Sequence, residues 1–261
     1  RRPRRTAATA AALTIGLALV SMAAVVSDSL KATIGKTLDT SISADLFISS
    51  EGGFGPPTGF SSDLVVDLSI AAEENPELID SAVSYRFAFA GMTVADDYKD
   101  VASTDLALLS RHMDIDLAEG SINAQAPEGS DGTLLLHSDP AETNNFSVGD
   151  QILVKFGGTR EANLTIAGIY HNATLLGNWV VDNSTFDKYL PQTQDFFLSI
   201  LYSPTTNTDE ALGLVTDLTD EYPQLAVESQ REYRESIEAQ LDQVLTIITV
   251  FLGLSLLIAV L

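Results

Sequence analysis

The sequence of 261 residues contains no cysteine. This absence excludes disulfide bonds, thiol nucleophiles, cysteine zinc sites and iron–sulfur clusters. Positive charge is also scarce, because 14 lysines and arginines stand against 36 aspartates and glutamates, for a formal net charge of −22. A chain this acidic repels phosphate backbones, so we expect no nucleic-acid partner. Its apolar content of 45% is still enough to form a packed core.

The few cations are unevenly placed. Four of them lie in the first five residues, RRPRR, and no acidic residue precedes Asp28. From Thr6 to Val26 the chain carries no charge, and as a helix this run is roughly 30 Å long, one hydrocarbon thickness. The arginines place its start in the cytoplasm. We therefore predict an outward membrane helix; a signal peptide shares the basic start and apolar run, but the length of this run favours a retained helix.

The C-terminal segment, Val244 to Leu261, is also free of charge. Either apolar segment alone is compatible with a buried core helix, but their placement at the two ends favours two membrane helices. We expect both ends to be cuts through a longer, multi-pass protein of the cell membrane, with residues 28–243 extracytoplasmic.

Apolar residues recur at helical spacing beside both membrane segments. This pattern predicts two stalk helices that pack on each other just outside the bilayer. The stripes are Leu30, Ile34 and Leu38 after the first segment, and Tyr233, Ile237, Leu241 and Val244 before the second.

Between the stalks, the sequence predicts two β-α-β units. Alternating apolar residues indicate strands, Ser61 or Ser62 and Asn207 or Thr208 are expected helix caps, and Asn75-Pro76 and Pro223 end the helices. We therefore predict an α+β fold with split porter-like β-α-β units, a β-rich inserted subdomain and two flanking transmembrane helices. The strands expected in the units are 45–49, 79–89, 196–202 and 225–228. Those expected between the units are 92–95, 98–102, 133–137, 151–156, 162–170 and 178–182, with short helices at 139–146 and 184–190.

Signals for chemistry are weak. Gly35-Lys36-Thr37 is only the tail of a phosphate-binding loop, and Gly53-x-Gly55 lacks the third glycine of a dinucleotide fingerprint. The histidines show no metal-ligand spacing, and the acidic groups form no complete calcium loop. We expect no catalytic, cofactor-binding or metal-binding residues and no enzymatic activity. The candidates considered are His112, His137 and His171, with the acidic groups Asp114, Asp116 and Glu119 and Asp96, Asp97 and Asp100.

Several segments resemble actinobacterial ABC-transporter permeases of the FtsX/MacB type, and the resemblance covers almost the whole chain. The segments are RRPRRTAATAAALTIGLALVSM, SVGDQILVKF, LTIAGIY and YRESIEAQLDQVLTIITVFLGLSLLIAVL. The resemblance implies a permease subunit in the lipid bilayer, in a homo- or pseudo-dimeric arrangement, with a separate cytoplasmic ABC ATPase subunit as partner. Its MacB-like periplasmic core domain would then couple ATP-driven motion to export or extraction of a substrate.

With this resemblance, the chain is expected to divide into seven parts. The cytoplasmic coupling helix and further membrane helices of such permeases are absent from the sequence. The alternative is the extracytoplasmic domain of a two-helix chemoreceptor or sensor kinase, and an adhesion or scaffold domain needs only the same topology. The expected parts are the basic flank and membrane helix 1–27, stalk 28–42, first porter-like half 43–110, insertion 111–194, second porter-like half 195–229, stalk 230–243 and membrane helix 244–261.

Overall fold

The computed structural model divides into two compact units. One consists of the two long terminal helices, and the other, the sheet unit, comprises residues 41–51 and 56–230. The structure describes residues 3–50, 58–172, 176–191 and 194–260. Within the two long helices it describes the side chains of 14–33, 35, 36, 41, 230–251, 253 and 254.

The helical unit contains α1 (Pro3–Ser41) and α7 (Gln230–Val260). Each is one continuous helix across the predicted boundary between membrane segment and stalk. An ion pair between Lys31 and Asp242 joins them. Among the described residues, one stretch is long and apolar enough to cross a bilayer, Thr14–Thr33, with a mean hydropathy of 1.5.

The predicted stripe on α7 is partly covered, whereas part of the predicted stripe on α1 is exposed. On α7, all four residues of the stripe are partly covered. On α1, Leu30 is 45% exposed, so its expected place in a packed stripe is wrong, and the side chains of Ile34 and Leu38 lie outside the described residues. The less exposed face of α1 instead carries mostly small side chains, which permit close helix approach. Its described members are Gly16, Val20, Ala23, Ser27, Lys31 and Gly35.

The sheet unit is built on the two predicted β-α-β units, which form one antiparallel group of four strands in the order β10-β1-β9-β2. This is the strand order of a split β-α-β fold. The first unit is β1 (Leu46–Ser50), α2 (Asp63–Glu74) and β2 (Ile79–Val94); the second is β9 (Asp195–Tyr202), α6 (Thr208–Thr219) and β10 (Leu225–Ser229).

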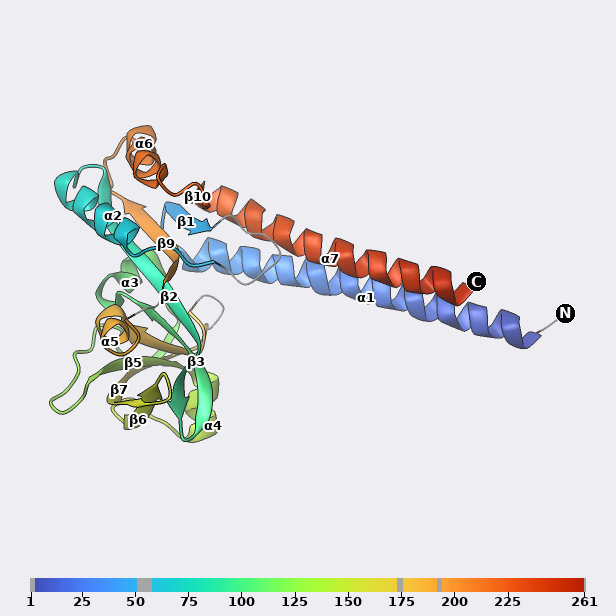
Figure 1. Ribbon diagram of the computed structural model, residues 1–261, viewed down its shortest axis with the longest axis horizontal. Coiled ribbons are helices and arrows are strands. Elements are labelled where there is room, and N and C mark those ends of the chain that lie inside the picture. The colour runs from blue at the N-terminus through green and yellow to red at the C-terminus, as the bar shows by residue number, and fades with distance from the viewer. Residues whose placement is uncertain (1–2, 51–57, 173–175, 192–193, 261) are drawn as a thin grey trace. The chain divides into compact units, whose positions relative to one another are not determined.

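Helices α2 and α6 cover the same face of these strands (Figure 1). Leu64 and Leu68 of α2 and Val215 of α6 pack with the strand residues Ile48 and Ile200 in one buried apolar cluster. The opposite face carries α3 (Leu106–His112), which contacts β2 and β9. The sheet is therefore covered on both sides in this region.

The strands of the predicted insertion extend the same sheet, because β3, which belongs to the predicted first porter-like half, continues from β2 and pairs in parallel with β8. Strands β3, β5, β6, β7 and β8 enclose a second apolar core with the end of β2, α4 (Ser138–Asn144) and α5 (Asn183–Tyr189). The subdomain boundaries at 111 and 194 stay a prediction. The strands are β3 (Asp97–Thr104), β4 (Leu117–Gly120), β5 (Gly132–His137), β6 (Gln151–Phe156), β7 (Arg160–Tyr170) and β8 (Trp179–Asp182).

Two hairpins turn through positive φ angles. The expected β6–β7 hairpin is confirmed, with Gly157 and Gly158 at φ +55° and +78°. The β2–β3 hairpin turns at Ala95 and Asp96, at +49° and +68°. Two positive φ angles in succession match the twist of the flanking strands.

Candidate functional site

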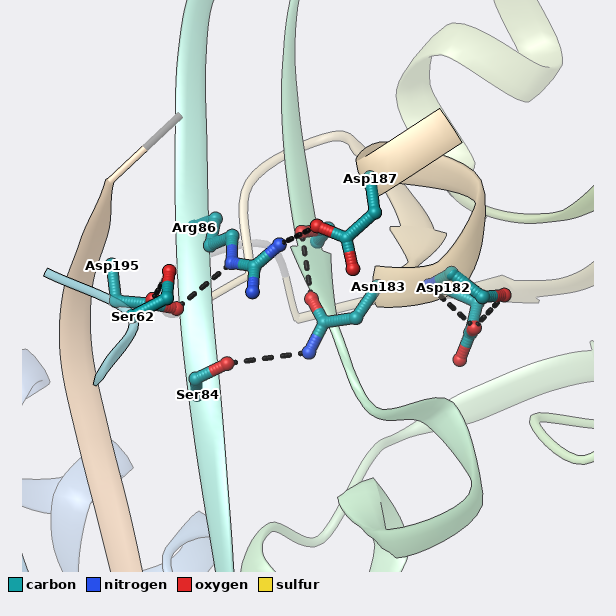
Figure 2. A network of polar contacts seen from close by, with 9 residues as sticks. Ser62, Ser84, Arg86, Asp182, Asn183, Asp187 and Asp195 are labelled. Carbon is teal, nitrogen blue, oxygen red and sulfur yellow. Dashed lines mark hydrogen bonds and ion pairs between the residues drawn. The ribbon is translucent and has the colours of Figure 1, made fainter. Parts of the chain in front are cut away.

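A polar network lies where strands β2 and β9 meet helices α2 and α5, and Arg86 of β2 is its centre. Nε of Arg86 donates to the Asp195 carboxylate at 2.9 Å, and a terminal nitrogen of the same guanidinium is paired with Asp187. Figure 2 shows the guanidinium between the two carboxylates. The Arg86 side chain is 10% exposed and that of Asp195 is fully buried.

Asp195 connects β9 to the start of α2. Its carboxylate accepts a hydrogen bond of 2.5 Å from the Ser62 hydroxyl, and its backbone exchanges two hydrogen bonds with Phe60. Ser62 was an expected helix cap and stands at the N-cap position, but its side chain makes no capping bond because the hydroxyl is given to Asp195. Ser61 binds the backbone N–H of Asp63 instead, at 3.2 Å.

Helix α5 is bound to the strands through Asn183 and Asp187. Nδ2 of Asn183 donates to the Ser84 hydroxyl of β2 at 3.3 Å, and Oδ1 accepts from the Ser103 hydroxyl of β3 at 2.8 Å. Asp182 is the N-cap of α5, since its carboxylate accepts from the backbone N–H of Ser184. The network therefore ties α5, β2, β3, β9 and the start of α2 together (Figure 2).

The electrostatics of the network keep its charges paired. Burial alone would lower the pKa of Arg86, but hydrogen bonds and charge attraction from Asp195 and Asp187 outweigh burial and raise it. A buried guanidinium with a carboxylate on two sides holds its partners in a fixed geometry and has no proton to exchange near neutral pH. The arrangement holds α5 and β9 to β2 through paired charges.

His112 lies apart from the other two histidines, which are joined by a hydrogen bond. His112 is buried, and its ring nitrogens are each 2.8 Å from a serine hydroxyl, Ser81 on one side and Ser199 on the other. Nε2 of His137 donates to the carbonyl oxygen of His171 at 2.9 Å, while its Nδ1 accepts from a backbone N–H at the start of α4. His112 and His137 are thus engaged in packing.

The acidic candidates are not brought together as ligands. No cluster of three or more metal-ligating side chains occurs in the described part of the chain. The carboxylate of Asp100 accepts from the backbone N–H of Ala90, and Asp97 lies 3.6 Å from Lys99. Gly35-Lys36-Thr37 lies inside α1, and Gly53-x-Gly55 is outside the described residues.

Sequence reasoning missed the Arg86 network. The one available signal was an arginine among the small and polar even positions of the strand 79–89. Its partners are 101 and 109 residues further along the chain, so local periodicity carries no information about them.

The chain is similar to known transporter domains. The family model of the MacB-like periplasmic core domain matches residues 6–218. The fold resembles the periplasmic region of MacB from Actinobacillus actinomycetemcomitans, at 13% identity and a TM-score of 0.55, covering 77% of this chain and 95% of that one. That likeness shows the fold.

Two further solved structures have lower scores. The extracellular domain of the noncanonic ABC-type transporter YknZ from Gram-positive bacteria gives 12% identity and a TM-score of 0.47, covering 72% of this chain and all of that one. A domain of a putative permease protein from Porphyromonas gingivalis gives 12% and 0.42, covering 71% and 88%. No curated protein sequence matches the chain.

Proposed function

The chain belongs to the MacB-like periplasmic core domain family, and from this we propose that it couples the motion of a separate cytoplasmic ABC ATPase to export or extraction of a substrate. The family places it among ABC-transporter permeases of the MacB/FtsX type, as the sequence resemblance predicted. Family membership does not favour the sensor alternative. The proposal makes this chain the mechanical part of a transporter, with ATP hydrolysis on another subunit.

The observation that carries the proposal is the continuity of the two long helices with the two ends of the sheet unit. α1 ends at Ser41, five residues before β1 begins, and α7 begins at Gln230, directly after β10. β1 and β10 are neighbours in the sheet, with Leu46 opposite Ser229. A continuous helix transmits rotation and translation, whereas a flexible joint absorbs them, so motion of either helix reaches adjacent strands.

The remaining parts of the proposal follow the predicted topology. Residues 28–243 are extracytoplasmic, 1–27 forms a cytoplasmic basic flank and a transmembrane helix, 244–261 lies in the bilayer, and the permease works as a homo- or pseudo-dimer. The stretches 28–42 and 230–243 act as stalks, joined in the helical unit by Lys31 and Asp242.

The experiment that tests the proposal interrupts α7. Three glycines inserted after Gln240 cost roughly 1 kcal/mol each relative to alanine and separate Ile237 from Leu241 and Asp242. In the full transporter with its ATPase, we expect ATP hydrolysis to survive and transport to be lost, because the ATPase is untouched and the linkage is cut. Transport into or out of vesicles and ATP hydrolysis are measured on the same preparation.

Two matched insertions serve as controls. Three glycines after Gly129, where φ is +87° and an added Cβ would meet nothing within 4 Å, should leave transport unchanged. Three alanines after Gln240 keep the helix but rotate its faces, so they separate the effect of stiffness from that of register. Wild-type transport by the glycine insertion after Gln240 would make α7 a passive tether and contradict the proposal.

A further inference from the structure

The segment between α1 and β1, residues 41–44, is held against the end of α3 inside the sheet unit. We call it the root segment. Ile42 and Ala44 are buried, so the segment is part of the packed structure rather than a loose link. Its backbone contacts are the hydrogen bonds from Asp114 N to Ser41 O (2.7 Å) and from Ser43 N to His112 O (2.9 Å), and an antiparallel bridge between Ile42 and Met113.

The other long helix begins at the same place. Gln230 is the first residue of α7, and its Nε2 donates to the carbonyl oxygen of Ile42 at 3.2 Å. Ser41, the last residue of α1, and Gln230 both belong to the sheet unit. The two junctions between long helices and sheet therefore meet on the root segment.

His112 is the residue that connects this segment to the sheet. Its backbone oxygen holds Ser43, while its ring lies between the hydroxyls of Ser81 on β2 and Ser199 on β9, 2.8 Å from each. Ser199 also donates to the phenolic oxygen of Tyr85 at 3.4 Å. His112 is 1% exposed, so these bonds are shielded from bulk solvent.

The ring chemistry satisfies both bonds. A neutral imidazole has one donor and one acceptor, so with the Ser199 hydroxyl directed to Tyr85, Nδ1–H donates to Ser199. Nε2 then accepts from Ser81 when that hydroxyl turns to the ring from the Asp80 carboxylate, 3.0 Å away. Burial and the charge of Arg111 lower the pKa of His112 to about 4, against an opposing effect of Asp80, so the ring is neutral at physiological pH. Hydrogen bonds are directional, and a ring fixed at both nitrogens cannot slide as an apolar side chain does.

We propose that His112 is a positioning residue that transmits displacement of the root segment to strands β2 and β9. The inference rests on the proposed function, because it names the contact by which helix motion enters the sheet. The path runs from Ile42 and Ser43 through the His112 backbone to its ring, and from there to the two serines. The substitution His112→Leu would keep an apolar side chain of similar size in this place but remove the hydrogen bonds to Ser81 and Ser199.

The first test uses the purified chain in detergent and needs no transport. Gln230→Ala removes one bond to the root segment, and hydrogen exchange is followed at the amides of 198–200 relative to those of 134–136, so that a general loss of stability cancels. With His112 present, we expect Gln230→Ala to raise the ratio of the exchange rates of amides 198–200 to those of amides 134–136 about two- to tenfold. In the His112→Leu background, we expect Gln230→Ala to leave this ratio unchanged. Equal changes in both backgrounds would overturn the proposal.

A matched control is available at His137, a second buried histidine with hydrogen bonds at both ring nitrogens. In His137→Leu, the effect of Gln230→Ala on 198–200 should persist. The single tryptophan, Trp179, is buried in β8 and reports by fluorescence whether each variant folds. If His112→Leu does not fold, Ser199→Ala removes one of the two ring contacts, and the same loss of response is expected there.

The second test uses the full transporter with its ATPase. His112→Leu should keep ATP hydrolysis and lose transport, while His112→Gln, which retains a donor and an acceptor, should recover part of it. If glycines after Gln240 abolish transport but His112→Leu transports at the wild-type rate, the proposed function stands and the role of His112 is wrong. If the glycine insertion has no effect, the proposed function fails, and the exchange experiment still decides on His112.

Discussion

The pairing of Arg86 with Asp195 shows how a buried charge restricts substitution. Asp195 has no exposed surface and depends on Arg86 and Ser62 for its hydrogen bonds. Removing one member of a buried ion pair leaves the other charge without compensation, which costs more than the pair itself contributes. The stability of the fold should therefore fall more when one member of the Arg86–Asp195 pair is replaced than when both are replaced by neutral residues.

We predict that Arg86→Met lowers the free energy of unfolding by about 3–5 kcal/mol. The double variant Arg86→Met with Asp195→Asn should lose less, because no charge is then left buried. Urea unfolding followed by Trp179 fluorescence measures both. Lys188→Met is the matched control, since its pair with Asp131 is largely exposed and surface pairs contribute about 1 kcal/mol or less. Equal losses for Arg86→Met and Lys188→Met would contradict the prediction.

His112 gives the sheet unit a predictable response to acid. Burial in the fold lowers its pKa to about 4, from the ordinary histidine value of 6.5. Between these pH values the unfolded state binds more protons, so this group's contribution to stability falls as pH drops from about 6.5 and is fully lost below about 4. The difference corresponds to about 3 kcal/mol.

The measurement is the pH dependence of urea unfolding for the wild type and for His112→Gln. We expect the wild type to lose stability more steeply between pH 6.5 and 4, because glutamine does not titrate. The charged neighbours Arg111 and Asp80 are present in both proteins. Parallel curves for the two proteins would show that His112 is not held neutral by the fold.

At the scale of elements, alternation and turn residues were reliable guides. The four strands of the β-α-β units and the β6–β7 hairpin lie where the sequence placed them, because half-buried strands show their period directly. The predicted strands 79–89 and 92–95 are one strand, β2, since the chain passes an irregularity between Ala88 and Met92 with a positive φ at Ala90. The alternation of apolar residues shows where β2 is interrupted, but it does not show that β2 pairs with β3 on both sides of the interruption.

Two short elements escaped prediction. α3 has seven residues and β4 has four, and at such lengths the period is weak evidence; α4, α5 and β8 are as short, but they were predicted. The start of α3 did carry a signal, because Asp105 accepts hydrogen bonds from the backbone N–H groups of Ala107 and Leu108. Because His112 is the last residue of α3, the contact between α3 and the root segment could not be predicted either.

The error at Leu30 has a different cause. Large apolar residues at helical spacing predict a packed face, but small residues also pack between helices, because they let the two backbones approach closely. Leu30 is exposed, while Ser27 and Lys31 lie on the less exposed face of α1. The spacing of the large apolar residues alone therefore does not identify the contact face of this helix.

At the scale of the whole molecule, charge and hydropathy determine the expected topology. The arginines of RRPRR precede every acidic residue, and the 36 acids follow the first apolar run. Because positive charge is retained in the cytoplasm, the sheet unit is expected outside. The absence of cysteine makes this directly measurable, since a single introduced thiol is the only one in the chain.

We predict that Glu128→Cys reacts with a membrane-impermeant thiol reagent on intact cells. Glu128 is exposed, whereas Asp131 nearby binds Asn163 and Lys188, and these contacts lower its pKa to about 2, so a change there would disturb the fold. Thr6→Cys, beside the arginines, should react only after the cells are opened. Labelling of position 128 only after lysis would place the sheet unit in the cytoplasm. The two long helices would then cross in the opposite sense, and extracytoplasmic coupling would have to be abandoned.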